Sequence, residues 1–321
     1  MQNYDVLIAS ASWEARSIAI LRYLDELHFT QAYVFRYTHK RPRSAELAEQ
    51  HHHSLLLTRL ENSCELPVVP LDGDLWDALK SLKSLVTRIR RTFGQDKGLR
   101  IFFDVSTFTK AYVLVFLRYL DDDALRNKLT LFYTDLAQPQ QGRPSEGVRK
   151  VIALPFYGGD YVAGKDTLLI TFLASEPERV TALWEHISPQ KTIPLFSYRR
   201  DEHNPLGSMI LKEQFLGRPG VEAPVQVDGT DPLKIAACLA GIYAQYRGQY
   251  NVVFGAVGSK LQSVGLYIFS KLQGVTPEIF YAVAAKYNLD YWNPTVIGPS
   301  MIIEIANEYS IKPLEAEPVT C

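Results

Sequence analysis

The chain has 321 residues, of which 47% are hydrophobic and 21% charged, and this composition excludes an intrinsically disordered protein. Its three cysteines, Cys64, Cys238 and Cys321, are too few and too far apart for a disulfide framework or a four-ligand zinc site. The net charge of −1 gives no general field for nucleic acid or for an anionic membrane. The length fits one large domain or two medium ones.

The N-terminal segment shows none of the features of a secretory signal. Residues 1–5 carry no basic cluster, and the apolar run at 6–11 is soon interrupted by polar residues. The longest apolar runs, such as 111–117, are shorter than the ~20 residues that a membrane helix needs. We therefore expect a soluble, cytoplasmic protein with no membrane partner.

The first half of the chain alternates short apolar runs with segments of helical apolar spacing. Strands are expected at 4–9, 32–37, 66–71, 100–105 and 129–133. Helices are expected at 13–27, 75–92 and 107–119. Such alternation predicts a mainly parallel sheet with helices on both faces.

The second half repeats this order. Strands are expected at 167–173, 192–198, 225–227, 250–254 and 278–283, followed by a last strand at 301–305. Helices are expected at 177–187, 232–246 and 261–272. Both halves therefore have the pattern of an α/β domain.

Short motifs recur in the same order in the two halves. They pair Ser12 and Arg16 with Ser175 and Arg179, Phe35 and Tyr37 with Phe196 and Tyr198, Gly73 with Gly229, Lys110 with Lys260, and Tyr133 with Tyr281. The spacing between partners shrinks steadily along the chain, as the loss of loop residues in one copy would produce. We predict two tandem Rossmann-like doubly wound domains related by internal duplication, at 1–140 and 167–321, with a connector at 141–166. The alternative is one larger doubly wound domain.

Ligands of open parallel sheets bind outside the carboxyl ends of the strands, near helix N-termini. After the first strand of each half, the candidate ligand-binding residues are Ser10, Ser12 and Arg16, and then Ser175 and Arg179. A serine at this position can equally be a helix N-cap. The arginine one turn later can face a bound anion or solvent.

A later strand in each half is followed by a second candidate loop. In the first half this loop holds Ser106, Thr107, Thr109 and Lys110, and in the second it holds Gly255, Gly258, Ser259 and Lys260. Lysine in the first turn opposes the helix dipole, so an anionic ligand would explain it better than a helix cap alone. Neither loop has the Walker spacing or Gly-x-Gly-x-x-Gly, and we expect no NAD or FAD cofactor.

On these loops the chain resembles the CRISPR-associated Rossmann-fold (CARF) domains and the related SAVED sensor domains. The resemblance implies binding of a cyclic oligonucleotide in a cleft between two such domains, and some relatives, the ring nucleases, also cleave it. It assigns catalytic roles to Ser12, Lys110 and Lys260. Thr107 and Phe108 replace the glycine pair that the family commonly has before its Thr-Lys. No appended effector domain is visible, so an output would come from a partner protein, and a homodimer is compatible with this interpretation.

The resemblance leads to the hypothesis of a nucleotide sensor in prokaryotic antiviral defence, with cleavage, if any, independent of a metal. Aromatic residues at strand ends, among them Tyr37, Phe108 and Tyr281, either stack on bases or close the core. Two other function classes stay open: a scaffold subunit without activity, and a metabolic enzyme acting on a phosphorylated or nucleoside substrate.

We assign no binding or catalytic site to two clusters of charged or polar residues. His51, His52 and His53 are adjacent, so they cannot all face one metal ion from a regular helix, and we expect an exposed face and no metal. The basic run at 88–91 is interpreted as a solvated face, and we expect no general nucleic-acid binding.

Overall fold

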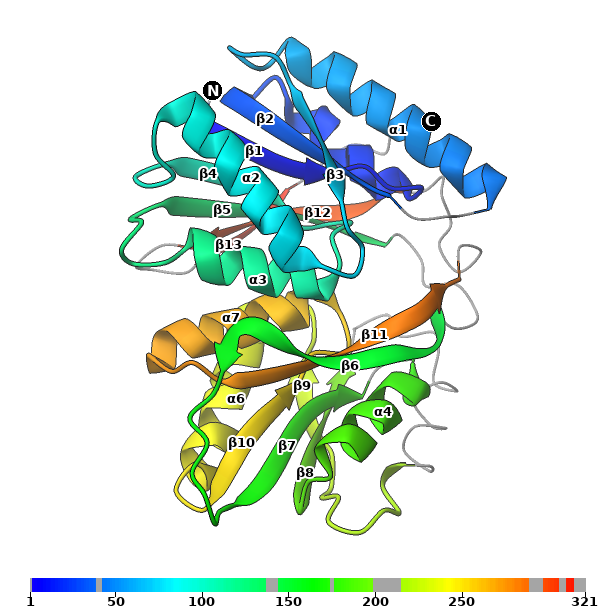
Figure 1. The fold of residues 1–321 in the computed structure, drawn as a ribbon, viewed down its shortest axis with the longest axis vertical. Helices are drawn as coiled ribbons and strands as arrows, with labels where there is room; N and C mark the ends of the chain where they lie inside the picture. Colours follow the sequence, from blue (N-terminus) through cyan, green and yellow to red (C-terminus); the bar gives the residue numbers. More distant parts are fainter. Residues whose placement is uncertain are drawn as a thin grey trace. The chain divides into compact units, whose positions relative to one another are not determined.

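The computed structural model describes residues 2–38, 42–136, 144–173, 176–198, 215–288, 297–305 and 310–314. The chain forms two compact units (Figure 1). Unit 1 comprises Met1–Tyr112, Phe116–Gln140 and Trp292–Cys321, and unit 2 comprises Val113–Val115 and Gln141–Tyr291. Within the described ranges, no helix has the length and apolar character needed to cross a membrane.

Unit 1 is built on a seven-stranded sheet in the order β13-β12-β5-β4-β1-β2-β3. Its strands are β1 (Gln2–Ser10), β2 (Leu27–Tyr37), β3 (Val69–Gly73), β4 (Arg100–Asp104), β5 (Lys128–Leu136), β12 (Ile297–Ile305) and β13 (Ser310–Leu314). The strands from β5 to β3 are parallel, whereas β12 is antiparallel to β5 and β13 is antiparallel to β12.

Helical segments cover both faces of this sheet. They are η1 (Ala15–Tyr23), α1 (Arg43–Glu61), α2 (Ala78–Phe93) and α3 (Lys110–Leu120). On one face, Leu56 and Leu60 of α1 join a buried cluster with Leu7 and Phe29. On the other face, Phe35 of β2 meets Phe108 with ring centroids 5.6 Å apart. The burial of these side chains is the main stabilising contribution to the unit.

Unit 2 is built on a six-stranded sheet in the order β6-β11-β10-β7-β8-β9. Its elements are β6 (Ser145–Gly158), β7 (Asp166–Leu173), α4 (Pro177–Ile187), β8 (Lys191–Tyr198), β9 (Val225–Asp228), α6 (Pro232–Tyr246), β10 (Tyr250–Gly255), α7 (Lys260–Gln273) and β11 (Glu278–Tyr287). Val180 and Leu183 of α4 pack in a cluster with Val257 and Ala282. Phe269 of α7 contacts Phe254 of β10 and Tyr243 of α6.

The five parallel strands have the same order in both units. They run β3-β2-β1-β4-β5 in unit 1 and β9-β8-β7-β10-β11 in unit 2. This confirms the predicted α/β fold with two mainly parallel, doubly wound sheets. Internal duplication stays a prediction, which the shared strand order favours.

The expected domain boundaries differ from the structure at two places. The segment expected as a connector, 141–166, contains β6, which pairs antiparallel with β11. The expected last strand of the second domain lies in β12, which pairs with β5 of unit 1. An antiparallel strand added to the side of a parallel sheet finds its partner through backbone hydrogen bonds, and the order of elements in the sequence does not reveal that partner.

The first helices also differ from expectation. The helix predicted at 13–27 is the shorter 3₁₀ segment η1, and α1 was not predicted. The sequence of α1 is dominated by polar and histidine residues, so its apolar pattern was too weak to predict a helix with a buried face. That face has helical spacing, through Glu49, His52, Leu56 and Leu60.

Candidate functional site

The carboxyl ends of β1 and β4 are tied together in unit 1. Thr107 Oγ1 donates to the Ser10 carbonyl at 2.8 Å, so the 2.7 Å bond between the two hydroxyls has Ser10 Oγ as its donor. Ser10 is only 1% exposed. Both hydroxyls thus join the two predicted loops to each other. The structure brings these two predicted residues together, in contact with protein groups.

Ser106 extends this link to β5. Its Oγ accepts a hydrogen bond from the Thr134 amide at 2.9 Å, and its own amide donates to Asp104 Oδ1 at 2.9 Å. Ser106 is buried. The hydroxyl therefore satisfies a backbone group of the neighbouring strand, which is a structural role.

Thr109 and Lys110 begin α3 at the carboxyl edge of the sheet. Thr109 is the N-cap, and its side chain accepts from the Tyr112 amide at 3.4 Å. The Thr109 amide donates to the Tyr37 hydroxyl at 3.3 Å, which fixes the loop against β2. Lys110 is the first helical residue and is partly exposed. A cation thus stands beside the amide groups of a helix start.

Ser12 lies in the loop between β1 and η1, and α1 holds its backbone. The Ser12 carbonyl accepts from His52 Nδ1 at 2.7 Å and from Ser17 Oγ at 3.3 Å. The Ser12 hydroxyl accepts from the Glu14 amide at 3.4 Å and keeps its own proton for donation. Ser12 is buried, so its loop has a defined conformation within the unit.

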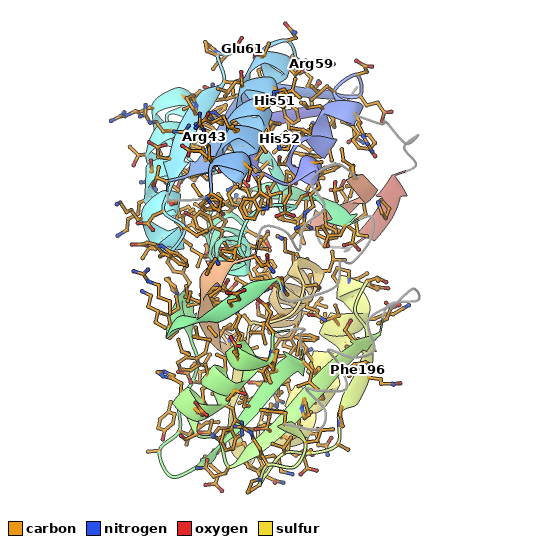
Figure 2. All side chains as sticks on the ribbon, turned by 90° about the vertical axis from the view of Figure 1, so that its right-hand side faces the viewer. Arg43, His51, His52, Arg59, Glu61 and Phe196 are labelled. Atoms are coloured by element: carbon orange, nitrogen blue, oxygen red, sulfur yellow. The ribbon has the colours of Figure 1, made fainter. Side chains whose placement is uncertain are left out.

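His52 is the residue of this neighbourhood that sequence reasoning placed wrongly. The histidine run was expected to be exposed, but His52 is 9% exposed, while His51 beside it is exposed (Figure 2). Burial lowers the pKa of His52, and the bond to the Ser12 carbonyl opposes this effect. Its place on the buried face of α1 was the available signal. Among the described residues, no cluster of metal-ligating side chains occurs.

Arg16 is buried in an ion pair. Its Nε donates to Glu14 Oε2 at 2.6 Å, and its Nη1 donates to the Thr134 carbonyl at 3.5 Å. Burial alone would lower the pKa of Arg16, but the Glu14 carboxylate and Tyr133 raise it, and the net pKa is raised. The predicted ligand arginine is thus engaged with protein groups.

Arg179 makes the corresponding bonds in unit 2. Its Nη1 donates to Glu176 Oε2 at 2.8 Å and its Nε donates to the Ala282 carbonyl at 2.8 Å. The guanidinium lies over the Tyr281 ring, 5.0 Å from its centroid. Burial would lower the pKa of Arg179, yet its neighbours Tyr281 and Glu176 raise it above its usual range. The Ser145 hydroxyl also donates to Glu176.

The end of β10 and the loop that joins it to α7 contain the glycines predicted to admit a ligand, Gly255 and Gly258. Ser259 is the N-cap of α7 in a capping box with Gln262, and Lys260 is the first helical residue. Gly258 has φ of +99°, and a Cβ there would collide with the Gln262 side chain. A Cβ on Gly255 would collide with Thr171. Side chains of the unit itself therefore fill the space that both glycines leave.

The remaining predicted residues contribute less to this edge. Ser175 lies outside the described residues. Phe108, Tyr37, Tyr133 and Tyr281 are all buried, so they close the core. Of the two roles considered for these aromatic residues, the structure supports the core role at these four positions.

No protein-family model and no curated protein matches the chain. Among solved structures, it is similar to Can2 from Sulfobacillus thermosulfidooxidans in complex with cyclic tetra-adenylate, with TM-score 0.30 and 14% identity over 45% of this chain and 36% of the Can2 chain. A universal stress protein from Archaeoglobus fulgidus gives TM-score 0.25 and 8% identity over 87% of this chain and 96% of its own. The leucoanthocyanidin reductase–NADPH complex from Vitis vinifera gives TM-score 0.22 and 8% identity over 86% of this chain and 92% of its own.

The aligned part is about a third of the Can2 chain, and all three TM-scores and identities are low. No ligand and no activity follows from these likenesses.

Proposed function

We propose that the chain binds an anionic, nucleotide-type ligand of the cyclic oligonucleotide class through the loops that carry Lys110 and Lys260. The observation that carries this proposal is the repetition of one arrangement. In both units a hydroxyl N-cap, Thr109 or Ser259, precedes a lysine at the first position of the helix. Helix α3 follows β4, which lies beside β1, and α7 follows β10, which lies beside β7; β1 and β7 are the middle strands of the two sets of five parallel strands.

The electrostatics favour an anion at these positions. A helix start presents unpaired amide groups and the positive end of the dipole, so a lysine there stabilises the helix less than a neutral side chain would. A bound phosphate relieves this conflict, because it attracts both the lysine and the helix end. Each helix start can thus hold one phosphate group of a nucleotide-type ligand.

The ligand contacts are assigned to fewer residues than the sequence predicted. Ser10, Ser106, Thr107, Arg16 and Arg179 bind groups of their own unit, and we assign them to holding the loops. Ser12, Thr109, Lys110, Ser259 and Lys260 stay as candidates for contact. A role as a defence sensor is part of the same proposal.

Metal-independent cleavage of the ligand is the finer part of the proposal. A ribose 2′-hydroxyl aligned with the adjacent phosphorus can displace the 5′-oxygen, and the reaction leaves a cyclic phosphate and a new 5′-hydroxyl. Lys110 or Lys260 would stabilise the charge that develops on the phosphoryl oxygens. The Ser12 hydroxyl, which keeps its proton, would donate a hydrogen bond to the ligand.

Calorimetric titration with cyclic tetra-adenylate tests the proposal, with linear tetra-adenylate and cyclic dinucleotides as comparisons. We expect tight binding of a cyclic compound, at least ten-fold weakened by Lys110→Ala or Lys260→Ala. Lys128→Ala is the matched control. Lys128 is exposed at the start of β5, at the edge of the sheet opposite the carboxyl edge where Lys110 lies. Chromatography of the mixtures reports cleavage.

Absence of binding to every compound, or equal binding by the wild type and both lysine variants, would overturn the proposal. The first of these results would favour the scaffold alternative.

A further inference from the structure

Helix α2 carries a continuous basic face. Its buried side consists of Ala78, Ser81, Leu82, Leu85, Val86 and Ile89. Its exposed side carries Lys80, Lys83, Ser84, Thr87, Arg88, Arg90 and Arg91. The helix holds no acidic residue between its first and last positions. In a chain of net charge −1, this concentrates positive charge on one element.

Most of this charge is not neutralised locally. Lys83, Arg88 and Arg91 form no salt bridge with any part of the chain that the structure describes. Arg90 pairs with Asp96 at 3.0 Å, and Lys80 stands 4.0 Å from Asp74, the limit of an ion pair. Three cations of the face therefore lack a counter-ion among the described residues.

Helix stability does not account for the whole face. Arg90 and Arg91 are in the last turn, where cations complement the helix dipole. Lys80 and Lys83 lie in the first two turns, where the dipole disfavours them. The Asp77 side chain caps the helix by accepting from the Lys80 amide at 2.9 Å, which offsets this cost in part.

We propose that the exposed face of α2 binds the phosphate backbone of a nucleic acid strand or duplex. At 1.5 Å per residue, Lys80 and Arg91 are about 16 Å apart along the helix, a span that covers several phosphates. Arginine and lysine are the residues that bind phosphate oxygens, arginine in a bidentate manner. Ser84 adds a hydroxyl between the cations, of the kind that contacts phosphates.

The same face lacks the features that other anionic partners need. A protein interface has an apolar core, and a membrane-surface helix inserts apolar side chains. The large hydrophobic residues exposed in the described part of the chain include none from α2. With no aromatic side chain among its exposed residues, the face cannot stack on bases, so the binding is independent of sequence. The run at 88–91, expected to be only solvated, is extended by Lys80 and Lys83.

Fluorescence anisotropy of the full chain with a labelled 20-base-pair DNA duplex and a single-stranded RNA tests this inference, at salt concentrations from 25 to 200 mM. We expect binding that weakens as salt rises, and a triple variant Lys83→Gln/Arg88→Gln/Arg91→Gln that binds at least ten-fold less tightly at 50 mM salt. For the duplex, the negative slope of log K against log salt should be shallower in this variant than in the wild type, by about 2 to 3.

A second triple variant, Arg43→Gln/Arg59→Gln/Lys150→Gln, removes the same charge from exposed positions on α1 and β6 (Figure 2 labels the two arginines). It should bind as the wild type does. Equal loss in both variants, no binding at 25 mM salt, or binding to phosphatidylserine vesicles but to neither nucleic acid would each overturn the inference. All of its sites lie outside the loops of the proposed ligand site, so the two proposals succeed or fail separately.

Discussion

Arg16 and Arg179 make corresponding bonds in the two units. Each pairs with a glutamate of the loop that precedes its helical segment, and each donates to a carbonyl of the last parallel strand, Thr134 in β5 or Ala282 in β11. The residue before each carbonyl is a buried tyrosine. The repeated Ser-x-x-x-Arg motif therefore marks an internal link between the first loop and the fifth strand. This agreement of contacts favours the predicted duplication.

Removal of the Arg179 guanidinium should destabilise the protein strongly. Arg179→Met leaves the carboxylate of Glu176 buried without its partner, at a cost of about 3–5 kcal/mol in the free energy of unfolding. Denaturant titration followed by circular dichroism measures this cost.

Arg59→Met, which removes an exposed guanidinium from α1, is the control and should change stability by less than about 0.5 kcal/mol. The double variant Arg179→Met/Glu176→Gln should regain part of the loss, because no charge is then left unpaired. A double variant as unstable as the sum of the single changes would contradict the ion-pair explanation.

Asp228 should contribute stability that depends on pH. The hydroxyl of Thr230 and the ammonium of Lys234 lower the pKa of Asp228 to about 2, against the effect of burial. A carboxyl with a lowered pKa stabilises the fold fully above its unfolded pKa of about 4, and this contribution is lost as the pH falls from there through the folded pKa of about 2. We expect Asp228→Asn to cost about 1–2 kcal/mol at pH 6 and much less at pH 1.5, below the folded pKa, measured by urea titration. A cost that is the same at both pH values would show that the charge is not responsible.

His52, a basic group, should also make the stability of the protein depend on pH. Burial lowers the pKa of His52, so the folded state holds the neutral imidazole and loses stability as the pH falls below about 6.5. Replacement by glutamine removes the titration and keeps a donor for the Ser12 carbonyl. The loss of stability between pH 7.5 and 5.5 should be smaller in His52→Gln than in the wild type. His51→Gln, which keeps His52 and changes its exposed neighbour, is the control and should retain most of the wild-type loss of stability.

Cys64 should resist alkylation in the folded protein. Burial raises the pKa of its thiol to about 12, so the reactive thiolate is scarce at pH 8. We expect iodoacetamide to modify Cys64 at least a hundred-fold more slowly in the native protein than in 6 M guanidinium, as followed by mass spectrometry of its peptide. Equal rates in the two conditions would contradict this burial.

Alternating apolar patterns were sufficient to predict the parallel strands and the helices after β3, β4, β7, β9 and β10, because each of these elements buries a regular stripe or run. The same reasoning placed Lys110 and Lys260 at helix starts, where the structure has them. It did not predict the partners of side chains. Whether Ser10 faces a ligand or Thr107 depends on a contact between segments far apart in the sequence. The link from His52 to Ser12 depends in the same way on the packing of α1.

The pairing of β12 with β5 has a consequence for synthesis on the ribosome. When residues 2–136 have emerged, β5 still exposes the backbone groups of its outer edge, because β12 begins only at Ile297. The long segment of unit 2, Gln141–Tyr291, is translated in the interval. An unpaired edge strand is a template for aggregation, so the nascent chain stays vulnerable until β12 has been made. Unit 2, whose edge strand β6 is translated before its parallel strands, can complete its sheet first.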